Sequence, residues 1–352
     1  MSPHKALSRV TYAGSRTVLV EPAETPAPAP GQVRIEVAYT GICGTDLHIF
    51  HGDMDGRVKP PSVIGHEMSG RIAELGDHVT GWSVGDPVTV MPLAWCGHCP
   101  ACRAGHTHIC HKLNFLGIDS PGSMQNSWTV PAETLIRLPQ ELRLDHAALV
   151  EPTAVAVHDV RRGAVRPGEK TVVVGCGPIG LLIATVARRS GADIRLIEPD
   201  AFRRSVAESL GLPTLDPGAD DVTAVVEEWT DGAGAAVAFE VSGAAAGWTT
   251  AVGALAVRGR LVLVAIHPAP REVNLHRFFW RELTLTGARL YGRDDFETAT
   301  RLIADGDIPV ETLISRVEPL ERAAQAFAAL ESGAGVMKVL IDCRNEQMAG
   351  TG

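Results

Sequence analysis

Four of the seven cysteines in this 352-residue chain fall within fifteen residues, with the spacing C-x2-C-x2-C-x7-C. They are Cys96, Cys99, Cys102 and Cys110. Thiolates this close in sequence can converge on one Zn²⁺ ion, which favours tetrahedral sulfur coordination in closed structural sites. Two local disulfides, or a cysteine-rich loop without a metal, are the alternatives. Because a closed four-thiolate site leaves no open position for a substrate, we expect this zinc to support structure rather than catalysis.

A second set of possible metal ligands is spread along the chain. Cys43 lies in the stretch GICGTDLH over 41–48, and His66 lies in GHE over 65–67. Glu151 lies in an apolar stretch, where a carboxylate is costly to bury unless a metal or hydrogen bonds compensate it. A thiolate, an imidazole and one carboxylate would form an open, three-ligand zinc site, although each such residue alone is more often structural.

A G-x-G-x-x-G pattern, formed by Gly175, Gly177 and Gly180, follows an apolar stretch and precedes a helical one. Glycines at these positions allow a tight turn and the close approach of a pyrophosphate, whose charge the helix N-terminus stabilises. The pattern by itself is weak, but Glu198 ends the next apolar stretch, 18 residues after Gly180. This context predicts a dinucleotide-binding site.

The charges near this loop bear on the choice of dinucleotide. Glu198 is placed to accept hydrogen bonds from the adenosine ribose hydroxyls and would repel a 2′-phosphate, which favours NAD. Arg203 and Arg204 follow one helical turn later and could bind adenine or that phosphate, or simply face solvent. We therefore expect NAD, with NADP as the less favoured alternative, and we expect Cys176 in the loop only to fill space.

Two kinds of secondary structure must position these residues. The first half of the chain shows short strands broken by glycine and proline, which predicts a β-rich, barrel-like domain. Near residue 157 the pattern changes to apolar strands alternating with helices, which predicts an α/β domain with a parallel sheet covered on both faces. The expected strands are 33–38, 70–74, 86–91, 171–174, 194–197, 236–240, 260–264 and 337–342, and the expected helices are 178–189, 200–210, 296–304 and 320–330. The last strand is apolar enough to join a sheet and could complete the N-terminal domain.

The composition excludes several classes of protein. A formal net charge of −9 argues against a nucleic-acid or anionic-membrane partner. No uncharged apolar run approaches the roughly 18 residues of a membrane span. The stretch Met1–Val10 is polar, and we expect no signal peptide there. Clustered thiols without an export signal indicate a reducing cytoplasm, and the chain is long enough for two domains.

Taken together, these motifs resemble the zinc-dependent medium-chain alcohol dehydrogenases along essentially the whole chain. The resemblance rests on GHE at 65–67, the four-cysteine segment between it and the glycine loop, Cys43 upstream, and VEP at 150–152. Within that superfamily the chain resembles the threonine and polyol (sorbitol, butanediol) dehydrogenases. The segments that carry this closer similarity are CGTDLHI at 43–49, CGHCPACRAGHTHIC at 96–110 and GARLYGRDDFETA at 287–299.

The resemblance implies a fold and a domain organisation. It implies an α/β protein in which a GroES-like, β-rich catalytic domain is formed by residues 1–157 and 293–352. A Rossmann domain with a doubly wound parallel sheet is inserted at 158–292, and a lobe at 95–111 holds the structural zinc. Residues 122–128 (GSMQNSW) depart from the apolar stretch of many relatives, so we expect that wall to be reshaped.

The resemblance also implies roles for individual residues. The implied ligands of the catalytic zinc are Cys43, His66 and Glu151. Glu67 would be a neighbour that can approach or exchange onto the metal, while Thr45 and His48 match the positions of a proton relay. The implied cofactor contacts, besides the three glycines, are Pro178, Ile179, Glu198, Arg203, Val264, Ala265, Ile266, Leu290 and Tyr291.

The expected activity is the oxidation of a secondary alcohol to a ketone by hydride transfer to NAD, with one catalytic and one structural zinc per subunit. A polyol, a vicinal diol or an L-threonine-like β-hydroxy compound is the expected substrate, because the third zinc ligand is a glutamate rather than the cysteine of simple alcohol dehydrogenases. An NADPH-linked biosynthetic ketone reductase is the alternative, and a non-catalytic binding protein on the same fold is a remote one. We expect a cytoplasmic homo-oligomer, a tetramer or dimer, that binds neither nucleic acid nor membrane.

Overall fold

The computed structural model describes residues 7–24, 26–267, 269–333 and 335–345, and the chain divides into two compact units. Unit 1 comprises residues 1–151 and 292–352, and unit 2 comprises residues 152–291. The first division falls within helix α4 (Val150–Arg162), a few residues before the boundary expected from the sequence. Part of the stretch for which no signal peptide is expected, residues 1–6, lies outside the described residues.

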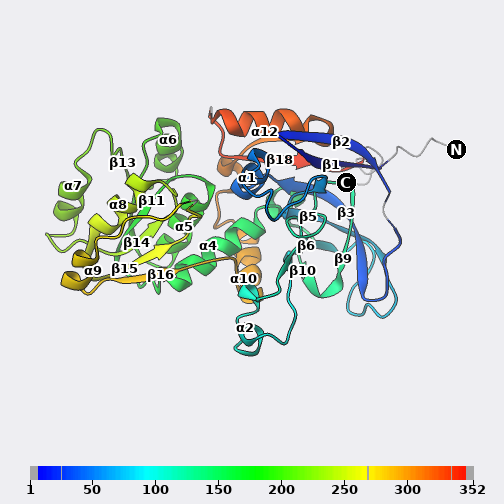
Figure 1. Ribbon diagram of the computed structural model, residues 1–352, viewed down its shortest axis with the longest axis horizontal. Coiled ribbons are helices and arrows are strands. Elements are labelled where there is room, and N and C mark those ends of the chain that lie inside the picture. The colour runs from blue at the N-terminus through cyan, green and yellow to red at the C-terminus, as the bar shows by residue number, and fades with distance from the viewer. Residues whose placement is uncertain (1–6, 25, 268, 334, 346–352) are drawn as a thin grey trace. The chain divides into compact units, whose positions relative to one another are not determined.

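Unit 1 is built mainly of antiparallel strands (Figure 1). Its described residues form a seven-stranded sheet in the order β10-β6-β5-β3-β18-β17, with β9 also paired to β3, and a three-stranded sheet in the order β2-β1-β4. The strands are β1 (Leu7–Gly14), β2 (Thr17–Ala23), β3 (Gln32–Gly41), β4 (Ser62–Val63), β5 (Glu67–Leu75), β6 (Pro87–Val90), β7 (Leu93–Ala94), β8 (Asn114–Phe115), β9 (Ser127–Pro131), β10 (Leu135–Arg137), β17 (Ile314–Pro319) and β18 (Lys338–Asp342).

The C-terminal strand β18 completes the sheet of the N-terminal half. Leu340 of β18 lies opposite Gly41 of β3 in an antiparallel pair, so the two ends of the chain share one sheet. This pairing confirms the return of the tail to the first domain. The helices of unit 1 are α1 (Gly44–His51), α2 (Pro100–Arg103), α3 (Leu144–Ala147), α10 (Arg293–Ala304), α11 (Val310–Leu313) and α12 (Ala323–Ser332), with short 3₁₀ turns at Thr107–Ile109, Ala132–Thr134 and Leu320–Arg322.

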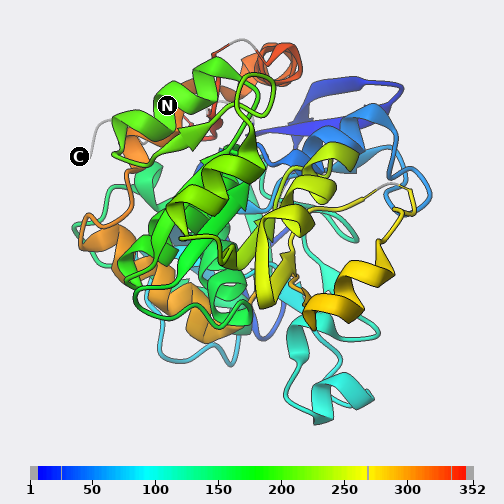
Figure 2. The same cartoon turned by 90° about the vertical axis from the view of Figure 1, so that its left-hand side faces the viewer.

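Unit 2 is a parallel sheet with helices on both faces (Figures 1 and 2). The six strands in its described residues lie in the order β13-β12-β11-β14-β15-β16, which is the 3-2-1-4-5-6 order of dinucleotide-binding sheets. The elements are β11 (Lys170–Val174), α5 (Pro178–Arg189), β12 (Asp193–Ile197), α6 (Ala201–Ser209), β13 (Thr214–Leu215), α7 (Val222–Trp229), β14 (Ala235–Glu240), α8 (Ala245–Ala254), β15 (Leu255–Leu263), α9 (Leu275–Arg281) and β16 (Thr284–Gly287).

The apolar strands are central in this sheet because they are buried on both faces. Val172 and Val173 of β11 are fully buried, and the helix α5 that follows buries Leu181 and Ile183. Strand β15 begins earlier than the sequence predicts, because it continues through Arg258, which has a positive φ of 57°. Among the described residues, no helix is long and apolar enough to cross a membrane.

Candidate metal and cofactor sites

The four clustered cysteines converge in a lobe of unit 1 that carries α2. Cys99 is the N-cap of α2, Cys102 lies within that helix, and Cys96 and Cys110 lie on either side of it in sequence. Their four Sγ atoms all lie within 4.8 Å of one another. In both Figures 1 and 2 this lobe projects from the rest of its unit.

The sulfur geometry distinguishes between a metal site and disulfides. The Sγ–Sγ distances are 3.5 Å for Cys99–Cys102, 3.8 Å for Cys99–Cys110 and 3.5 Å for Cys96–Cys110. A disulfide needs about 2.05 Å, so none of these pairs is bonded. A tetrahedron of sulfurs around zinc at about 2.3 Å has edges of about 3.8 Å. The residues therefore fit a four-thiolate zinc site and not the disulfide alternative.

The pKa shifts within the cluster also fit a metal site. Backbone N–H groups of Cys102 and His111 lower the pKa of Cys99 to about 5. Burial, and hydrogen bonding with Cys99, raise the pKa of Cys102 to about 12. The backbone can thus stabilise one thiolate, but several thiolates at these distances need a cation between them.

Cys43, His66 and Glu67 form a second group in unit 1, and their ligand atoms also lie within 4.8 Å of one another. Cys43 is the N-cap of α1, two residues after the end of β3, and Glu67 begins β5 beside that strand. A Cβ atom at Gly41 would lie 2.1 Å from Oε2 of Glu67, so a glycine at that position admits the carboxylate. The spacing of these donors suits one metal ion with an open coordination position.

Asp46 lies beside the His66 imidazole. This carboxylate is fully buried, accepts a hydrogen bond from the Cys43 backbone N–H at 2.9 Å, and places Oδ1 3.7 Å from Nδ1 of His66. Among the described residues, that Oδ1 and that Nδ1 have no hydrogen-bond partner. A carboxylate at Nδ1 leaves Nε2 to face a metal, an arrangement common around zinc-bound histidines. The fit of this group to a metal rests on that pair of buried atoms.

The charges around His66 raise its pKa. Burial alone would lower the pKa of His66, but the negative charges of Asp46, Cys43 and Glu151 outweigh it and raise the pKa well above its usual value. Burial raises the pKa of Asp46, and His66 opposes that shift. The sequence interpretation missed Asp46, whose signal is its position three residues after Cys43 at the start of a helix.

Lys338 is the other residue that the sequence interpretation missed. This lysine of β18 is 3% exposed, and its Nζ contacts Oε1 and Oε2 of Glu67 at 2.8 and 2.7 Å and the Ile42 carbonyl oxygen at 3.1 Å. Burial alone would lower the pKa of Lys338, but Glu67 and Cys43 outweigh it and raise the pKa. Its only sequence signal is a single lysine in the apolar closing strand.

Glu151 is buried at the start of α4 but does not belong to the group of ligand atoms within 4.8 Å in the described residues. Its negative charge raises the pKa of His66 and of Lys338. Its place as a zinc ligand stays a prediction, and the geometry brings Glu67 closer to the other two donors.

The two expected relay residues lie on one face of α1, three positions apart. Thr45 is partly exposed, and Nδ1 of His48 lies 3.0 Å from Oδ2 of Asp53. The hydrogen bond to His48 lowers the pKa of Asp53. The relay role of Thr45 and His48 stays a prediction.

The atypical stretch 122–128 supports the loop that carries His66. The backbone N–H of Ser123 donates to the Gly65 carbonyl at 2.9 Å, and that of Met124 donates to the Ile64 carbonyl at 3.0 Å. The Ser123 and Met124 side chains are fully buried, so this stretch is packed inside unit 1.

The glycine loop of unit 2 has the predicted form. Gly175 has φ +108°, and a Cβ at Gly180 would lie 1.9 Å from the Gly175 carbonyl oxygen. Gly177 is the N-cap of α5, and Pro178 and Ile179 form the first turn of this helix. The unpaired N–H groups of such a turn bind a pyrophosphate, so the loop fits a dinucleotide.

Glu198 lies at the end of β12 and holds this loop. Its Oε2 accepts from the Cys176 backbone N–H at 2.7 Å, and its Oε1 accepts from that of Asp200 at 3.0 Å. The Nη1 atom of Arg203 lies 4.0 Å from the position of a Cβ at Gly177, beside the loop. Arg204 instead donates to the Glu198 carbonyl oxygen at 2.8 Å, which gives it a structural role.

The expected nicotinamide contacts lie near the ends of β15 and β16. The backbone N–H groups of Val264 and Ala265 donate to the Glu240 carbonyl oxygen at 3.0 and 3.1 Å, and the Ile266 side chain is exposed. Beyond β16, Leu290 has a positive φ of 60° and Tyr291 is buried. Their contacts with a cofactor stay predictions.

Known proteins share both units. Residues 29–140 match the family described as alcohol dehydrogenase GroES-like domain, and residues 178–305 match zinc-binding dehydrogenase. The chain is 48% identical to 2-dehydro-3-deoxy-L-galactonate 5-dehydrogenase of Pseudoalteromonas atlantica, over 96% of this chain and 98% of that protein. It is 34% identical to L-threonine 3-dehydrogenase of Pyrococcus horikoshii, over 92% and 94% of the two chains.

Solved structures agree with these relatives. A zinc-binding dehydrogenase from Sinorhizobium meliloti, solved with NADP, superposes with a TM-score of 0.89 and 30% identity, over 96% of this chain and all of that one (100%). The GroES-like domain and the Rossmann-like sheet are thereby confirmed, as are a zinc-binding family and a nicotinamide cofactor. The chain belongs to the zinc-dependent medium-chain alcohol dehydrogenases and is an oxidoreductase that acts on CH–OH groups.

Proposed function

We propose that the chain oxidises a secondary alcohol to a ketone at a zinc ion held by Cys43, His66 and one carboxylate, Glu67 or Glu151, with NAD as the acceptor. The observation that supports this most directly is the convergence of three donor atoms within 4.8 Å, with Asp46 behind His66. When bound, zinc supplies Lewis-acid polarisation of an alcohol oxygen, and the nicotinamide accepts a hydride.

The residues of the chain divide the remaining work. With a metal bound, Asp46 would face Nδ1 of His66 and leave Nε2 to coordinate the ion. Lys338 compensates the charge of Glu67 in the protein interior, where an unpaired carboxylate would be costly. A proton released in the site would pass through Thr45 to His48, whose half-exposed ring beside Asp53 can return it to water.

The cofactor and the second metal follow from the other two sites. We assign NAD to the glycine loop because the buried carboxylate of Glu198 lies where a 2′-phosphate would be repelled. The position of Arg203 beside the loop, and the NADP carried by one similar structure, favour the alternative of an NADPH-linked reductase. The four-cysteine lobe would hold a structural zinc, which gives two zinc ions per subunit.

The substrate class is inferred from the similar proteins. The relative with 48% identity is named for a deoxy sugar acid, so we propose a polyhydroxy carboxylic acid as the substrate. L-Threonine is the second candidate, because a 34% identical relative is named for it. Sorbitol and 2,3-butanediol complete the set of secondary alcohols to be compared.

We also propose a homo-oligomer, with unit 2 contributing to its interface. Strand β16 is the edge of the described parallel sheet, and an exposed sheet edge can pair with a second copy. Leu275, Phe279 and Trp280 of α9 are 73%, 78% and 73% exposed, which is unusual for apolar side chains of this size. The seven cysteines, none of which is in a disulfide, suit a reducing cytoplasm.

The test combines metal analysis with steady-state kinetics. We expect two zinc ions per chain, and reduction of NAD faster than of NADP with a sugar acid bearing a secondary hydroxyl. Cys43→Ala should remove one zinc and the activity, while Cys343→Ala, at a buried cysteine outside both groups, should retain both. One zinc per chain would contradict the open site, and binding without turnover would support the non-catalytic alternative.

A further inference from the structure

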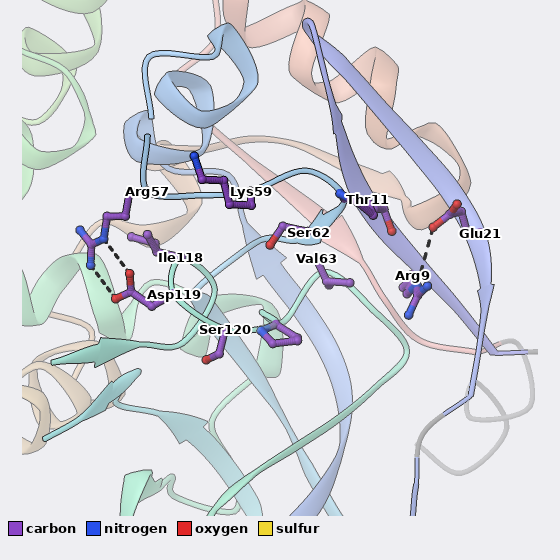
Figure 3. A pocket seen from close by; sticks show the side chains of 12 residues that line it. Arg9, Thr11, Glu21, Arg57, Lys59, Ser62, Val63, Ile118, Asp119 and Ser120 are labelled. Carbon is purple, nitrogen blue, oxygen red and sulfur yellow. Dashed lines mark hydrogen bonds and ion pairs between the residues drawn. The ribbon is translucent and has the colours of Figure 1, made fainter. Parts of the chain in front are cut away.

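Unit 1 contains a polar cavity that is separate from the two metal groups. Neither the sequence motifs nor the proposed function accounts for it. Its volume is about 460 Å³, which is within the range of about 300–1,000 Å³ typical of small-molecule sites. Strands β1 and β2 line one side, and the segments 57–63 and 118–121 line the other (Figure 3).

The charges of the lining are mixed, with an excess of positive charge. Arg57 forms a two-pronged ion pair with Asp119, at 2.7 and 2.6 Å, and Arg9 lies 3.8 Å from Glu21 without a hydrogen bond (Figure 3). In the described part of the chain, the Lys59 ammonium has no carboxylate partner and donates to a backbone carbonyl at 2.7 Å. Three cationic and two anionic side chains therefore line the cavity, in a protein whose net charge is −9.

Several buried polar atoms around the cavity have no partner among the described residues. They are Nε of Arg9, Oγ1 of Thr11 and Oγ of Ser120. Thr11 is only 3% exposed and lines the cavity. Buried polar groups in proteins are nearly always hydrogen-bonded, and exceptions call for a reason. The arginine Nε–H can only donate and the two hydroxyls can also donate, so these groups suit a ligand rich in acceptor oxygens.

We propose that this cavity binds a small polyhydroxylated monocarboxylate, an open-chain sugar acid. A carboxylate group would complement the excess positive charge and accept hydrogen bonds from Arg9 and Thr11. The ligand hydroxyls would donate to Glu21 and Asp119, which would repel a phosphate dianion or a polyanion. An uncharged polyol would leave the Arg9 guanidinium without a new anionic partner. The site stands on these contacts and does not depend on the proposed catalytic function.

The cavity also adjoins the segments that lead into the metal group. Val63 lies three residues before His66, and Ile118 lies three residues after Phe115, whose ring is edge-on to the His66 ring at 5.3 Å. A ligand between these two segments would brace both of them. We therefore expect occupancy of the cavity to raise the melting temperature of unit 1.

Isothermal titration of the zinc-loaded full chain tests the proposal, with D-gluconate as the probe and sorbitol and inorganic phosphate as comparisons. We expect saturable binding of gluconate and at least about tenfold weaker binding of the other two. Thr11→Val, which preserves shape, should weaken gluconate binding about 3- to 10-fold, and Arg9→Gln about tenfold or more. The matched controls are Thr129→Val and Arg34→Gln, because these residues also have a buried unpartnered atom but do not line the cavity.

The position of the ligand is settled by a variant of the metal group. In Cys43→Ala, gluconate binding should persist within about twofold, because the cavity contains no metal ligand. Loss of binding in Cys43→Ala together with unchanged binding in Thr11→Val and Arg9→Gln would place the ligand at the metal group and overturn the proposal. Absence of saturable gluconate binding to the wild-type chain would overturn it as well, as would equal binding of sorbitol.

Discussion

The ion pair between Lys338 and Glu67 gives a direct test of the electrostatics of the metal group. Both residues are buried, at 3% and 1% exposure, and both carboxylate oxygens contact the ammonium within 2.8 Å. Replacing Lys338 by methionine retains most of the side-chain volume but leaves the Glu67 charge without its partner. Breaking a buried pair in this way typically costs about 3–5 kcal/mol of unfolding free energy.

The measurement is denaturant unfolding of the zinc-free full chain, so that the metal does not compensate the lost charge. We expect Lys338→Met to destabilise by about 3–5 kcal/mol, and Glu67→Gln/Lys338→Met to be more stable than the sum of the single variants by about 2 kcal/mol. Lys170→Met is the control, because Lys170 pairs with Asp193 at the surface, where such pairs contribute about 0–1 kcal/mol.

The pH dependence of this effect follows from the raised pKa of Lys338. A group whose pKa is higher in the folded state contributes its full stabilisation below the unfolded value, about 10.4 for lysine, and loses it as the pH rises through the folded value. The difference between wild type and Lys338→Met should therefore stay constant from neutral pH to about pH 10. A cost under about 1 kcal/mol, or additive single and double variants, would refute the buried-pair reasoning.

Three further predictions concern the remaining sites. Because its pKa is raised, His66 should be protonated at neutral pH in zinc-free protein. Zinc uptake, followed with a pH indicator, should therefore release more protons at neutral pH than in alkaline solution, and equal release would contradict the raised pKa of His66. Cys99→Ser should lose one zinc and unfold the lobe or disturb assembly, whereas Cys43→Ala should lose activity in a folded protein. Metal content and circular dichroism measure these effects, and the reverse pattern would show that the metals are misassigned. Gly180→Ala should raise the KM for NAD about tenfold or more with zinc content unchanged, because its Cβ would meet the Gly175 carbonyl oxygen at 1.9 Å. The control is Gly253→Ala in the same unit, where a Cβ would meet nothing within 4 Å, and similar KM values for both variants would argue against a close approach of loop and helix at Gly180.

The fold was largely predictable because its signals are local. The strands of unit 2 are continuous apolar runs, and α5 occupies 178–189 as expected, since a Gly-Pro start and a Gly after its end delimit it. Strands β1 and β2 were not predicted, because half-exposed residues and Pro22 obscure the alternation in β2. The start of β15 was missed for a similar reason, because Arg258 and Gly259 interrupt the apolar run. The strand nevertheless continues through both residues.

Cys43 and His66 could be singled out from their motifs, but the structure groups them with Glu67 rather than with the expected Glu151. The residues that control the charge of this group could not be predicted. Lys338 and Glu67 lie 271 residues apart in sequence, and they come together because β18 and β5 both pair with β3. A sequence pattern cannot assign such a partner, because a single lysine in a strand is compatible with many environments. Asp46 is a different case, because its position three residues after Cys43 is a signal for the start of a helix. The same carboxylate also lies beside His66.

The two cysteine-containing groups therefore balance charge by different means. In the four-cysteine lobe, backbone N–H groups of Cys96, Cys102 and Lys112 face the sulfurs. Partial charges of this kind cannot neutralise four thiolates, so the proposed zinc would supply the balance if all four were ionised. In the Cys43 group, Lys338 already faces Glu67 with a full positive charge. A carboxylate held by a lysine through both oxygens is a weak permanent metal ligand, which leaves a role for Glu151 when a metal is bound. We therefore expect the four-cysteine lobe to depend on its proposed zinc for cohesion, and the Cys43 group to remain folded while its coordination changes.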